Sequence, residues 1–366
     1  MSKYFKYIWL VLLWVLVAAY VIYAGGRART IHSEKMVGDV RVNLLDSTSH
    51  GHLVSAAKVK RWLRGKVPTV GVAVDSVDLG AIESVVAENG FVEWVHAYIG
   101  FNGDIEIDIK QREPVLRFLV DGFNSYVTAD GYIFTAPSLF SLYVPVVTGG
   151  YRPPFPSSYS GFVGEWIEGE IAVLDDKIEA MEVEKYPFYE RDIVNDDSVK
   201  VVNRMFIKRD MFERKTDFEN RVSKLRRHKA WLRKKYRYEN VLIGQGIAKV
   251  EKKREIEREK QKKLGENYED FLKLINFVKF IDEDDFWRSE IVQINVEKTA
   301  SGEMELSFVP RSSSCTIVFG SMDDYEVKFE KLINFYERGF GRMGWSRYKV
   351  IDVKYRDLVV CKRYKK

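Results

Sequence analysis

The chain has 366 residues, of which 46% are hydrophobic and 14% aromatic, and these fractions exclude a largely disordered protein. This length is enough for two or three domains with separate cores. The net charge of +5 is unevenly distributed, because residues 200–263 contain 23 Lys/Arg and nine Asp/Glu and leave the rest of the chain at −9. The sequence therefore places one strongly basic segment within an acidic protein.

Cysteine is scarce, with only Cys315 and Cys361 in the whole chain, which excludes a disulfide scaffold. We expect free thiols, because cysteine is commonly buried as a small apolar side chain. The alternative is a structural pair between two neighbouring strands.

The most distinct local feature is an apolar run from Ile8 to Ala24. As a helix it would extend about 25 Å, and the aromatic residues before it lengthen the span toward the ~30 Å hydrocarbon core of a bilayer. The alternative is a cleaved signal peptide, but the run is longer than a usual signal core and no small-residue cleavage site precedes Gly25. We predict a cytoplasmic tail (1–7), a transmembrane helix (8–24) and a juxtamembrane linker (25–39).

The charges beside this helix do not determine its orientation. Lys3 and Lys6 precede it, whereas Arg27, Arg29 and Lys35 follow it, so the count of positive charges does not favour a cytoplasmic N-terminus. The long C-terminal body favours it, because large domains are translocated largely regardless of charge. We therefore expect the bulk of the chain to lie outside the cytoplasm.

Residues 40–114 have the pattern of a small α+β domain. Val40–Leu44 alternate as a strand, and two helical segments follow. The second helix would begin at Asp78, with Asp75 as an alternative N-cap. A hairpin is then predicted across Asn102-Gly103, which gives the element order β-α-α-β-β.

Residues 115–150 continue with short β segments and are predicted to form the first part of a β domain. The Gly- and Pro-rich stretch 149–158 indicates a loop or linker. The insertion 151–266 differs in character. It is charged and compatible with helix from Asp197 to Lys263, with an expected interruption near Gly244-Gln245-Gly246.

Two interpretations of the basic segment Lys200–Lys263 stay open. In the first, the segment binds an anionic surface, such as phospholipid, a polyanion or an acidic face of a partner. In the second, it is a solvated helical hairpin whose charges keep it in water. Nucleic acid fits the charge but not the expected location outside the cytoplasm, so we expect no nucleic-acid partner.

Residues 267–366 return to the pattern of a folded domain and are predicted to complete the β domain. Residues 268–281 predict an amphipathic helix. Its apolar stripe consists of Phe271, Leu272, Ile275 and Val278. Two alternating segments joined at 300–302 predict a hairpin, followed by a strand and a helix over 325–336. The chain should end in a hairpin at 348–362 whose final strand is a sheet edge.

Motifs of catalytic chemistry are weak in this sequence. The segment 339–344 (GFGRMG) matches G-x-G-x-x-G, but it follows a helix and precedes a strand, the reverse of a dinucleotide site, so we expect a helix C-cap and loop. His50 and His52, with His32 and Asp46 nearby, have no third ligand at a recognised spacing. The acidic run 282–285 predicts a solvated turn. Since H-E-x-x-H, P-loop and G-x-S-x-G motifs are absent, we expect no enzymatic activity, cofactor or metal site.

Several segments resemble the cell-division family FtsQ (DivIB). Residues 105–117 (IEIDIKQREPVLR) resemble the junction between its POTRA domain and its β domain. Further similar blocks follow in the family's order, the later ones resembling the version found in Bacteroidota. They are 126–131 (YVTADG), 144–149 (VPVVTG), 285–287 (DFW), 291–294 (IVQI), 319–320 (FG), 328–332 (KFEKL) and 359–362 (VVCK). The long insertion departs from the family, in which this connection is short.

The resemblance implies an α+β protein: a transmembrane helix, a POTRA domain (40–114), and a mixed or antiparallel β domain with flanking helices, interrupted by the charged helical insertion. It also implies a septal scaffold in the inner membrane, with a cytoplasmic N-terminus and a periplasmic bulk, that recruits the FtsB/FtsL coiled-coil pair. An edge strand offers unpaired N–H and C=O groups to which a partner strand can add. The predicted partner-binding residues are Tyr348, Val350, Asp352, Tyr355, Leu358 and Val360. The alternative is that this hairpin only closes the domain core.

Two other functional hypotheses come from different classes of protein. A POTRA-bearing export or envelope-assembly factor would usually carry repeated POTRA units or a β-barrel, and the sequence has neither a repeat nor a run of barrel strands. A membrane-anchored wall enzyme is the third hypothesis. Depletion distinguishes them, because a septation block favours the scaffold and lysis without a division defect favours the enzyme.

Overall fold

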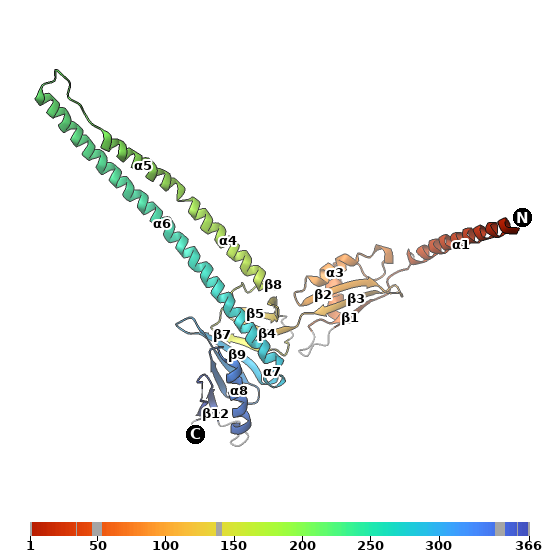
Figure 1. Ribbon diagram of the computed structural model, residues 1–366. Coiled ribbons are helices and arrows are strands. Elements are labelled where there is room, and N and C mark those ends of the chain that lie inside the picture. Colours follow the sequence, from red (N-terminus) through yellow and green to blue (C-terminus); the bar gives the residue numbers. More distant parts are fainter. Residues whose placement is uncertain are drawn as a thin grey trace. The chain divides into compact units, whose positions relative to one another are not determined.

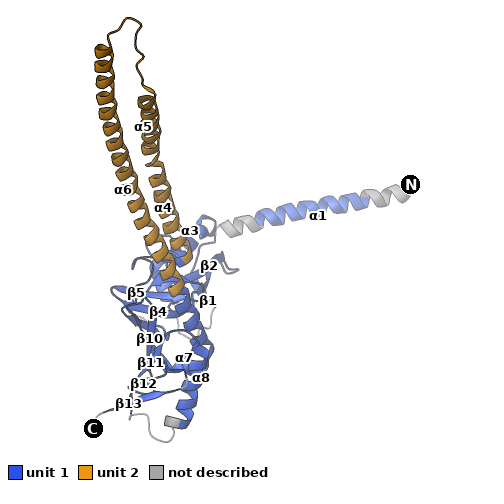
Figure 2. Cartoon of the chain, turned by 60° about the vertical axis from the view of Figure 1, so that its left-hand side comes forward, with its two compact units in different colours: residues 1–163, 272–366 blue, residues 164–271 orange. Residues whose placement is uncertain are grey.

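The computed structural model describes residues 2–33, 35–45, 53–136, 141–340, 348–356 and 358–364. The chain divides into two compact units (Figure 2). Unit 1 consists of residues 1–163 and 272–366, and unit 2 consists of residues 164–271. Unit 1 contains an N-terminal apolar helix and a large mixed sheet, which confirms the α+β class.

Helix α1 (Ser2–Ser33) is long and apolar. Its section Trp9–Arg27 has the length and composition to cross a membrane, and none of that section is buried within the protein. Because apolar surface costs about 25 cal/mol per Å² to keep in water, this section fits a single-pass anchor. The helix continues through Ser33, into the segment predicted as a linker. Gly25 and Gly26 do not end it, since glycine in a helix costs only about 1 kcal/mol relative to alanine.

The first folded domain is a three-stranded sheet in the order β1-β3-β2, covered by two helices. β1 (Val40–Leu44) is parallel to β3 (Ile105–Gln111), and β2 (Val92–Ile99) is antiparallel to it. Helices α2 (Ala56–Leu63) and α3 (Leu79–Ala87) lie between β1 and β2 in the chain, with a 3-10 turn, η1 (Val74–Ser76), between them. The predicted order β-α-α-β-β is therefore confirmed, as is the hairpin between β2 and β3.

Local signals explain these boundaries. The Asp78 carboxylate accepts a hydrogen bond from the backbone N–H of Ala81 at 2.9 Å, so it caps α3 as predicted, and the alternative Asp75 lies in η1. Gly103 has φ +85°, a conformation that glycine adopts without strain, which explains its place in the β2–β3 turn. The buried core of this domain is aliphatic: Val59, Leu63, Ile82, Val86, Ile105, Ile107 and Ile109 are its most deeply buried members.

The second sheet of unit 1 has ten described strands. They are β4 (Pro114–Val120), β5 (Phe123–Thr128), β6 (Tyr132–Thr135), β7 (Val146–Gly149), β8 (Gly161–Phe162), β9 (Ile291–Lys298), β10 (Met304–Pro310), β11 (Thr316–Gly320), β12 (Tyr348–Asp352) and β13 (Val360–Arg363). Their order is β13-β12-β11-β10-β9-β7-β4-β5-β6-β8. The pairs β4/β7, β7/β9 and β11/β12 are parallel and the others antiparallel, so the sheet is mixed.

One parallel pair joins strands that are far apart in the sequence. β7 and β9 run side by side with Val146 opposite Gln293 and Gly149 opposite Val296. The Gln293 side-chain amide donates to the Thr148 hydroxyl at 2.8 Å. Residues 114–149 and 291–363 therefore build a single sheet, although more than 140 residues separate the paired positions.

Two residues of the family-like junction make contacts with distant parts of the chain. The buried Gln111 side chain accepts a hydrogen bond from the backbone N–H of Leu53 at 3.0 Å. The guanidinium of Arg112 lies 3.4 Å from the centre of the Tyr132 ring, a cation–π contact onto β6. The sequence block 105–117 thus has a structural role at the place where the chain passes from one sheet to the other.

The second half of the large sheet is closed by an aromatic core. Phe277, near the end of α6 (Lys215–Glu283), packs on Phe308 of β10, Phe319 of β11 and Phe329 of α8 (Tyr325–Phe335). The predicted stripe of 268–281 was partly wrong, because Leu272 is exposed. The buried positions are Phe271, Leu274, Ile275, Phe277, Val278 and Ile281. Leu272 lies about 100° around the helix from Phe271, beyond the edge of this apolar face.

Unit 2 is a long helical hairpin. Helices α4 (Val163–Val183) and α5 (Tyr186–Arg204) run antiparallel to α6 (Figure 1). The predicted interruption at Gly244-Gln245-Gly246 is wrong, since α6 is continuous there. Packing accounts for Gly246, because a Cβ atom at this position would lie 2.2 Å from the Phe188 ring of α5.

The acidic run 282–285, predicted as a solvated turn, is the boundary between two helices. α6 ends at Glu283, and Asp284 caps α7 (Asp285–Glu290) by accepting from the backbone N–H groups of Phe286 and Trp287. Some residues singled out in the sequence lie outside the part of the chain that the structure describes. His50, His52 and Asp46 are not among the described residues, nor are the His32 side chain and residues 341–344 of the G-x-G-x-x-G match.

Candidate partner-binding edge

The last two strands form the edge of the large sheet. β12 lies between β11, to which it is parallel, and β13, to which it is antiparallel. Among the described strands β13 has a single neighbour, which confirms the prediction that the final strand is a sheet edge. One side of its backbone is therefore available for pairing.

The predicted partner-binding residues differ in accessibility. Tyr348 is buried, and its ring packs against Phe335 of α8 at 5.9 Å between ring centres, so it supports the fold. Val350 and Asp352 are half-buried. Three residues are exposed: Tyr355 (49%), Leu358 (65%) and Val360 (43%).

The register of β12 and β13 separates two faces of this hairpin. Asp352 lies opposite Val360, and Ile351 lies opposite Cys361. Since directly opposed residues share a face, Val360 and Asp352 face the accessible side, while the fully buried Ile351 and the half-buried Cys361 face the core. A bulge between Tyr348 and Val350 shifts the alternation, which explains why Tyr348 points inward.

The segment that leaves β12 is fixed by α8. The ammonium group of Lys331 donates to the backbone oxygens of Val353, at 3.1 Å, and Tyr355. The backbone N–H of Val353 donates to the oxygen of Val318 at 2.9 Å and so extends the β11–β12 pairing. The exposed Tyr355 therefore lies on a backbone held in place by helix and sheet.

A buried polar cluster lies behind the edge. The Glu290 carboxylate accepts from the hydroxyls of Ser312 and Tyr336, the latter at 3.2 Å. Burial and the nearby Glu290 carboxylate raise the pKa of the Tyr336 hydroxyl, so this group stays protonated and donates. The cluster connects the end of α7 with the helical turn after α8 (Tyr336–Phe340) and with the segment before β11, which makes it structural.

Both cysteines are free thiols. Cys315 is buried beside the Ser313 hydroxyl at 2.8 Å, and burial raises the pKa of its thiol. Burial likewise raises the pKa of the half-buried Cys361. Because the thiolate is the reactive form, these environments oppose nucleophilic chemistry.

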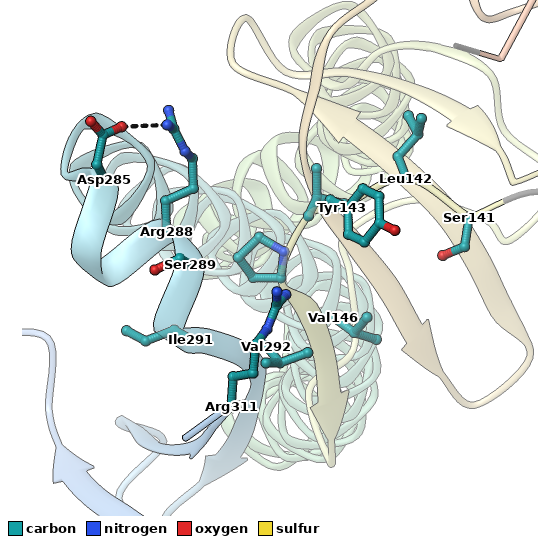
Figure 3. A pocket seen from close by; sticks show the side chains of 12 residues that line it. Ser141, Leu142, Tyr143, Val146, Asp285, Arg288, Ser289, Ile291, Val292 and Arg311 are labelled. Atoms are coloured by element: carbon teal, nitrogen blue, oxygen red, sulfur yellow. Dashed lines mark hydrogen bonds and ion pairs between the residues drawn. The ribbon is translucent and has the colours of Figure 1, made fainter. Parts of the chain in front are cut away.

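A surface pocket of about 400 Å³ lies between residues 141–146 and the α7–β9 region (Figure 3). Its polar lining includes Arg311 and Arg288, and Arg288 forms an ion pair with Asp285 on the same turn of α7. The lining brings together two cations and one carboxylate, without a cysteine or histidine. Among the described residues, no three His, Cys, Asp or Glu side chains are grouped to hold a metal ion.

Charged side chains also stabilise the hairpin of unit 2. Lys185, at the break between α4 and α5, is buried and pairs with Glu182 at 2.9 Å and with Glu251 of α6. Arg254 of α6 contacts the same two carboxylates. Part of the basic segment is thus neutralised within the hairpin itself.

The roles of Lys331, Glu290 and Lys185 are not visible in the sequence. Lys331 belongs to the block 328–332 (KFEKL), but its role depends on a backbone oxygen 22 residues away. Glu290 and Lys185 are ordinary charged residues in sequence, and only long-range packing buries them. No local pattern distinguishes such residues from solvated ones.

The fold and the open edge define a class: α+β proteins with one long N-terminal apolar helix and a large mixed sheet that ends in an accessible strand. Residues 255–362 match the protein family described as FtsQ/DivIB, C-terminal related. Residues 255–362 are therefore related to FtsQ/DivIB, and the match supports a role in cell division. The matched segment contains α7, β9–β11, α8, β12 and most of β13. No curated protein matches the chain.

Proposed function

We propose that this protein is a non-enzymatic scaffold of the division septum that recruits coiled-coil partners of the FtsB/FtsL kind by strand addition at β13. The observation that carries the proposal is the free edge of β13 within the segment related to FtsQ/DivIB. In this arrangement the partner's backbone pairs with β13, and its alternate side chains contact the exposed residues around the edge.

The accessible patch would consist of Tyr355, Leu358 and Val360, with Val350 and Asp352 beside them. The proposed contribution of Tyr348 is indirect, because its buried ring positions β12 against α8. Exposed cations surround this patch, namely Lys354, Arg356, Lys362 and Arg363. They favour a partner segment that carries acidic side chains next to its apolar ones.

The three-stranded domain is proposed to be a POTRA domain. Its order β-α-α-β-β and the sheet order β1-β3-β2 support this assignment, as does the sequence block at its junction with the large sheet. We place the N-terminus in the cytoplasm and the bulk in the periplasm, with α1 in the inner membrane. If protease added to spheroplasts leaves the C-terminal body intact, this topology is wrong.

Substitution of Val360 by proline tests strand addition. Proline removes a backbone donor and disrupts the strand, so Val360→Pro should abolish co-purification of the coiled-coil partners. Val360→Thr is the matched control, because threonine keeps the N–H group and the β-branched shape, and it should retain the partners. Normal capture by the proline variant would eliminate the edge-strand mechanism.

A comparison of the soluble body with and without residues 340–366 extends this test to the whole edge. The scaffold proposal expects the partners to be captured only when those residues are present. The alternative is a POTRA-bearing export or envelope-assembly factor. Depletion should then impair envelope assembly while septa still form, whereas the scaffold proposal expects filamentous or chained cells.

A further inference from the structure

The connection between α5 and α6 exposes three large apolar side chains. Phe206 is 73% exposed, Met211 92% and Phe212 96%. They lie within ten residues at the end of two long helices, where the chain reverses direction (Figure 1). Exposed apolar residues that occur together on a soluble surface usually indicate a binding site, because each one costs free energy in water.

Cations surround this apolar group. Residues 204–233, which we call the hairpin tip, contain 11 Lys/Arg and four Asp/Glu, a net charge of +7. Two of the four acidic residues, Asp210 and Glu213, form ion pairs with the same residue, Arg221. Within the described structure, nine of the tip's 11 cations take part in no ion pair: Arg204, Lys208, Arg209, Arg214, Lys224, Arg226, Arg227, Lys229 and Arg233.

We propose that the hairpin tip binds the surface of a bilayer that contains anionic phospholipid. Phe206, Met211 and Phe212 insert among the headgroups, and the surrounding cations contact lipid phosphates. Apolar side chains flanked by Lys and Arg are the combination that favours the interfacial region, since insertion and charge attraction add. A soluble polyanion would satisfy the charges but leave the three apolar side chains in water. The bilayer therefore accounts for both observations.

The hairpin is built to present this tip far from its base. Within unit 2, α6 extends from residue 215 to 271, about 85 Å of helix. Its pairing with α5 is fixed near the tip by Asn195, which is buried and donates to the backbone oxygen of Tyr236 at 3.0 Å. Nearer the base, the Lys185 ion pairs join α4 and α5 to α6. Membrane binding at the tip would hold a long rigid arm at a lipid surface, and this inference does not depend on the division role.

The test uses the full chain reconstituted through α1 into phosphatidylcholine nanodiscs. The discs are mixed with sedimentable vesicles of phosphatidylcholine, with or without phosphatidylglycerol. We expect the discs to sediment with the anionic vesicles only, and high salt to weaken this binding. The variant Phe206→Ser/Met211→Ser/Phe212→Ser should weaken it by roughly tenfold or more. The matched control Val183→Ser/Val241→Ser/Ile256→Ser removes three exposed apolar side chains elsewhere on the hairpin and should bind normally.

A local probe keeps the test independent of the triple variant. An environment-sensitive dye on Met211→Cys, in a Cys361→Ser background, should shift to the blue with anionic vesicles, whereas the same dye on Val241→Cys should not. Equal binding to both kinds of vesicle would overturn the proposal. A second outcome would also overturn it. If soluble polyphosphate displaces the vesicles, while the triple variant binds normally and the dye responds equally at both positions, the tip is a polyanion site instead.

Discussion

Two glycines of α6, only two residues apart, should respond differently to substitution by alanine. A Cβ atom at Gly244 would have no heavy atom within 4 Å. At Gly246 it would lie 2.2 Å from Cε1 and 2.7 Å from Cζ of the Phe188 ring. Both positions are helical, so the backbone contribution of the substitution is the same and only the packing differs.

These distances determine how much the two variants should differ in the free energy of opening the hairpin. Alanine stabilises a helix interior over glycine by about 1 kcal/mol, and Gly244→Ala should gain this amount. Gly246→Ala gains the same but forces the Phe188 ring out of its site, because carbon atoms pack at about 3.5–4.0 Å, and such overpacking costs about 1–3 kcal/mol. The two variants should therefore differ by about 1–3 kcal/mol in the free energy of opening the hairpin.

Amide hydrogen exchange of the full chain in detergent, resolved by peptide mass spectrometry, measures this local free energy. The difference corresponds to roughly 5- to 150-fold in exchange protection across α5 and the middle of α6. The peptides of the three-stranded domain serve as an internal reference, since neither substitution lies in that domain.

A second substitution identifies the cause. In a Phe188→Ala background the ring is gone, so Gly246→Ala should become as stabilising as Gly244→Ala. If Gly244→Ala and Gly246→Ala protect the hairpin equally in the natural background, α5 does not pack on α6 at Phe188.

Three further predictions concern Lys185, Gly149 and Cys315. Lys185→Ala should lower the free energy of opening the hairpin by about 1–3 kcal/mol, because it leaves two half-exposed glutamates with only one cation. Amide hydrogen exchange measures this free energy. Gly149→Ala should destabilise unit 1 by about 2–4 kcal/mol in urea titrations, since its Cβ would lie 2.4 Å from the backbone oxygen of Val296. Gly302→Ala is its control, with φ +90° but open space, and should cost about 1 kcal/mol. Burial raises the pKa of Cys315 above its ordinary 9.0, so its stabilising contribution is complete below pH 9 and is lost as the pH rises through the raised value. Alkaline unfolding followed by circular dichroism should therefore be less steep in Cys315→Val.

The sequence predicted the elements whose causes are local. The cap at Asp78, the turn at Asn102-Gly103 and the alternation of β9 and β10 each depend on residues within a few positions of one another. The final edge strand was predicted for the same reason, because the terminal hairpin has a visible period of two. Such signals need no knowledge of the rest of the chain.

Features that depend on distant residues were not predictable. α6 is continuous through Gly244-Gln245-Gly246 because its packing on the neighbouring helix outweighs the low helix propensity of the two glycines. Which of the predicted site residues are accessible also depends on distant residues. Tyr348 is buried because a bulge changes the alternation of β12, and a bulge depends on the partner strand.

The sheet tolerates the long insertion because the ends of unit 2 lie close together. Gly164 begins this unit, and a Cβ atom added there would lie 3.2 Å from the Tyr268 hydroxyl, near the unit's other end. The connection therefore leaves and returns at nearly one point, and the entropy of closing a loop grows only slowly with its length. The pairing of β7 with β9 requires nothing of the insertion except that its ends be near each other. A hairpin of any length would meet this requirement, so its length and its charged tip are free to serve a separate purpose.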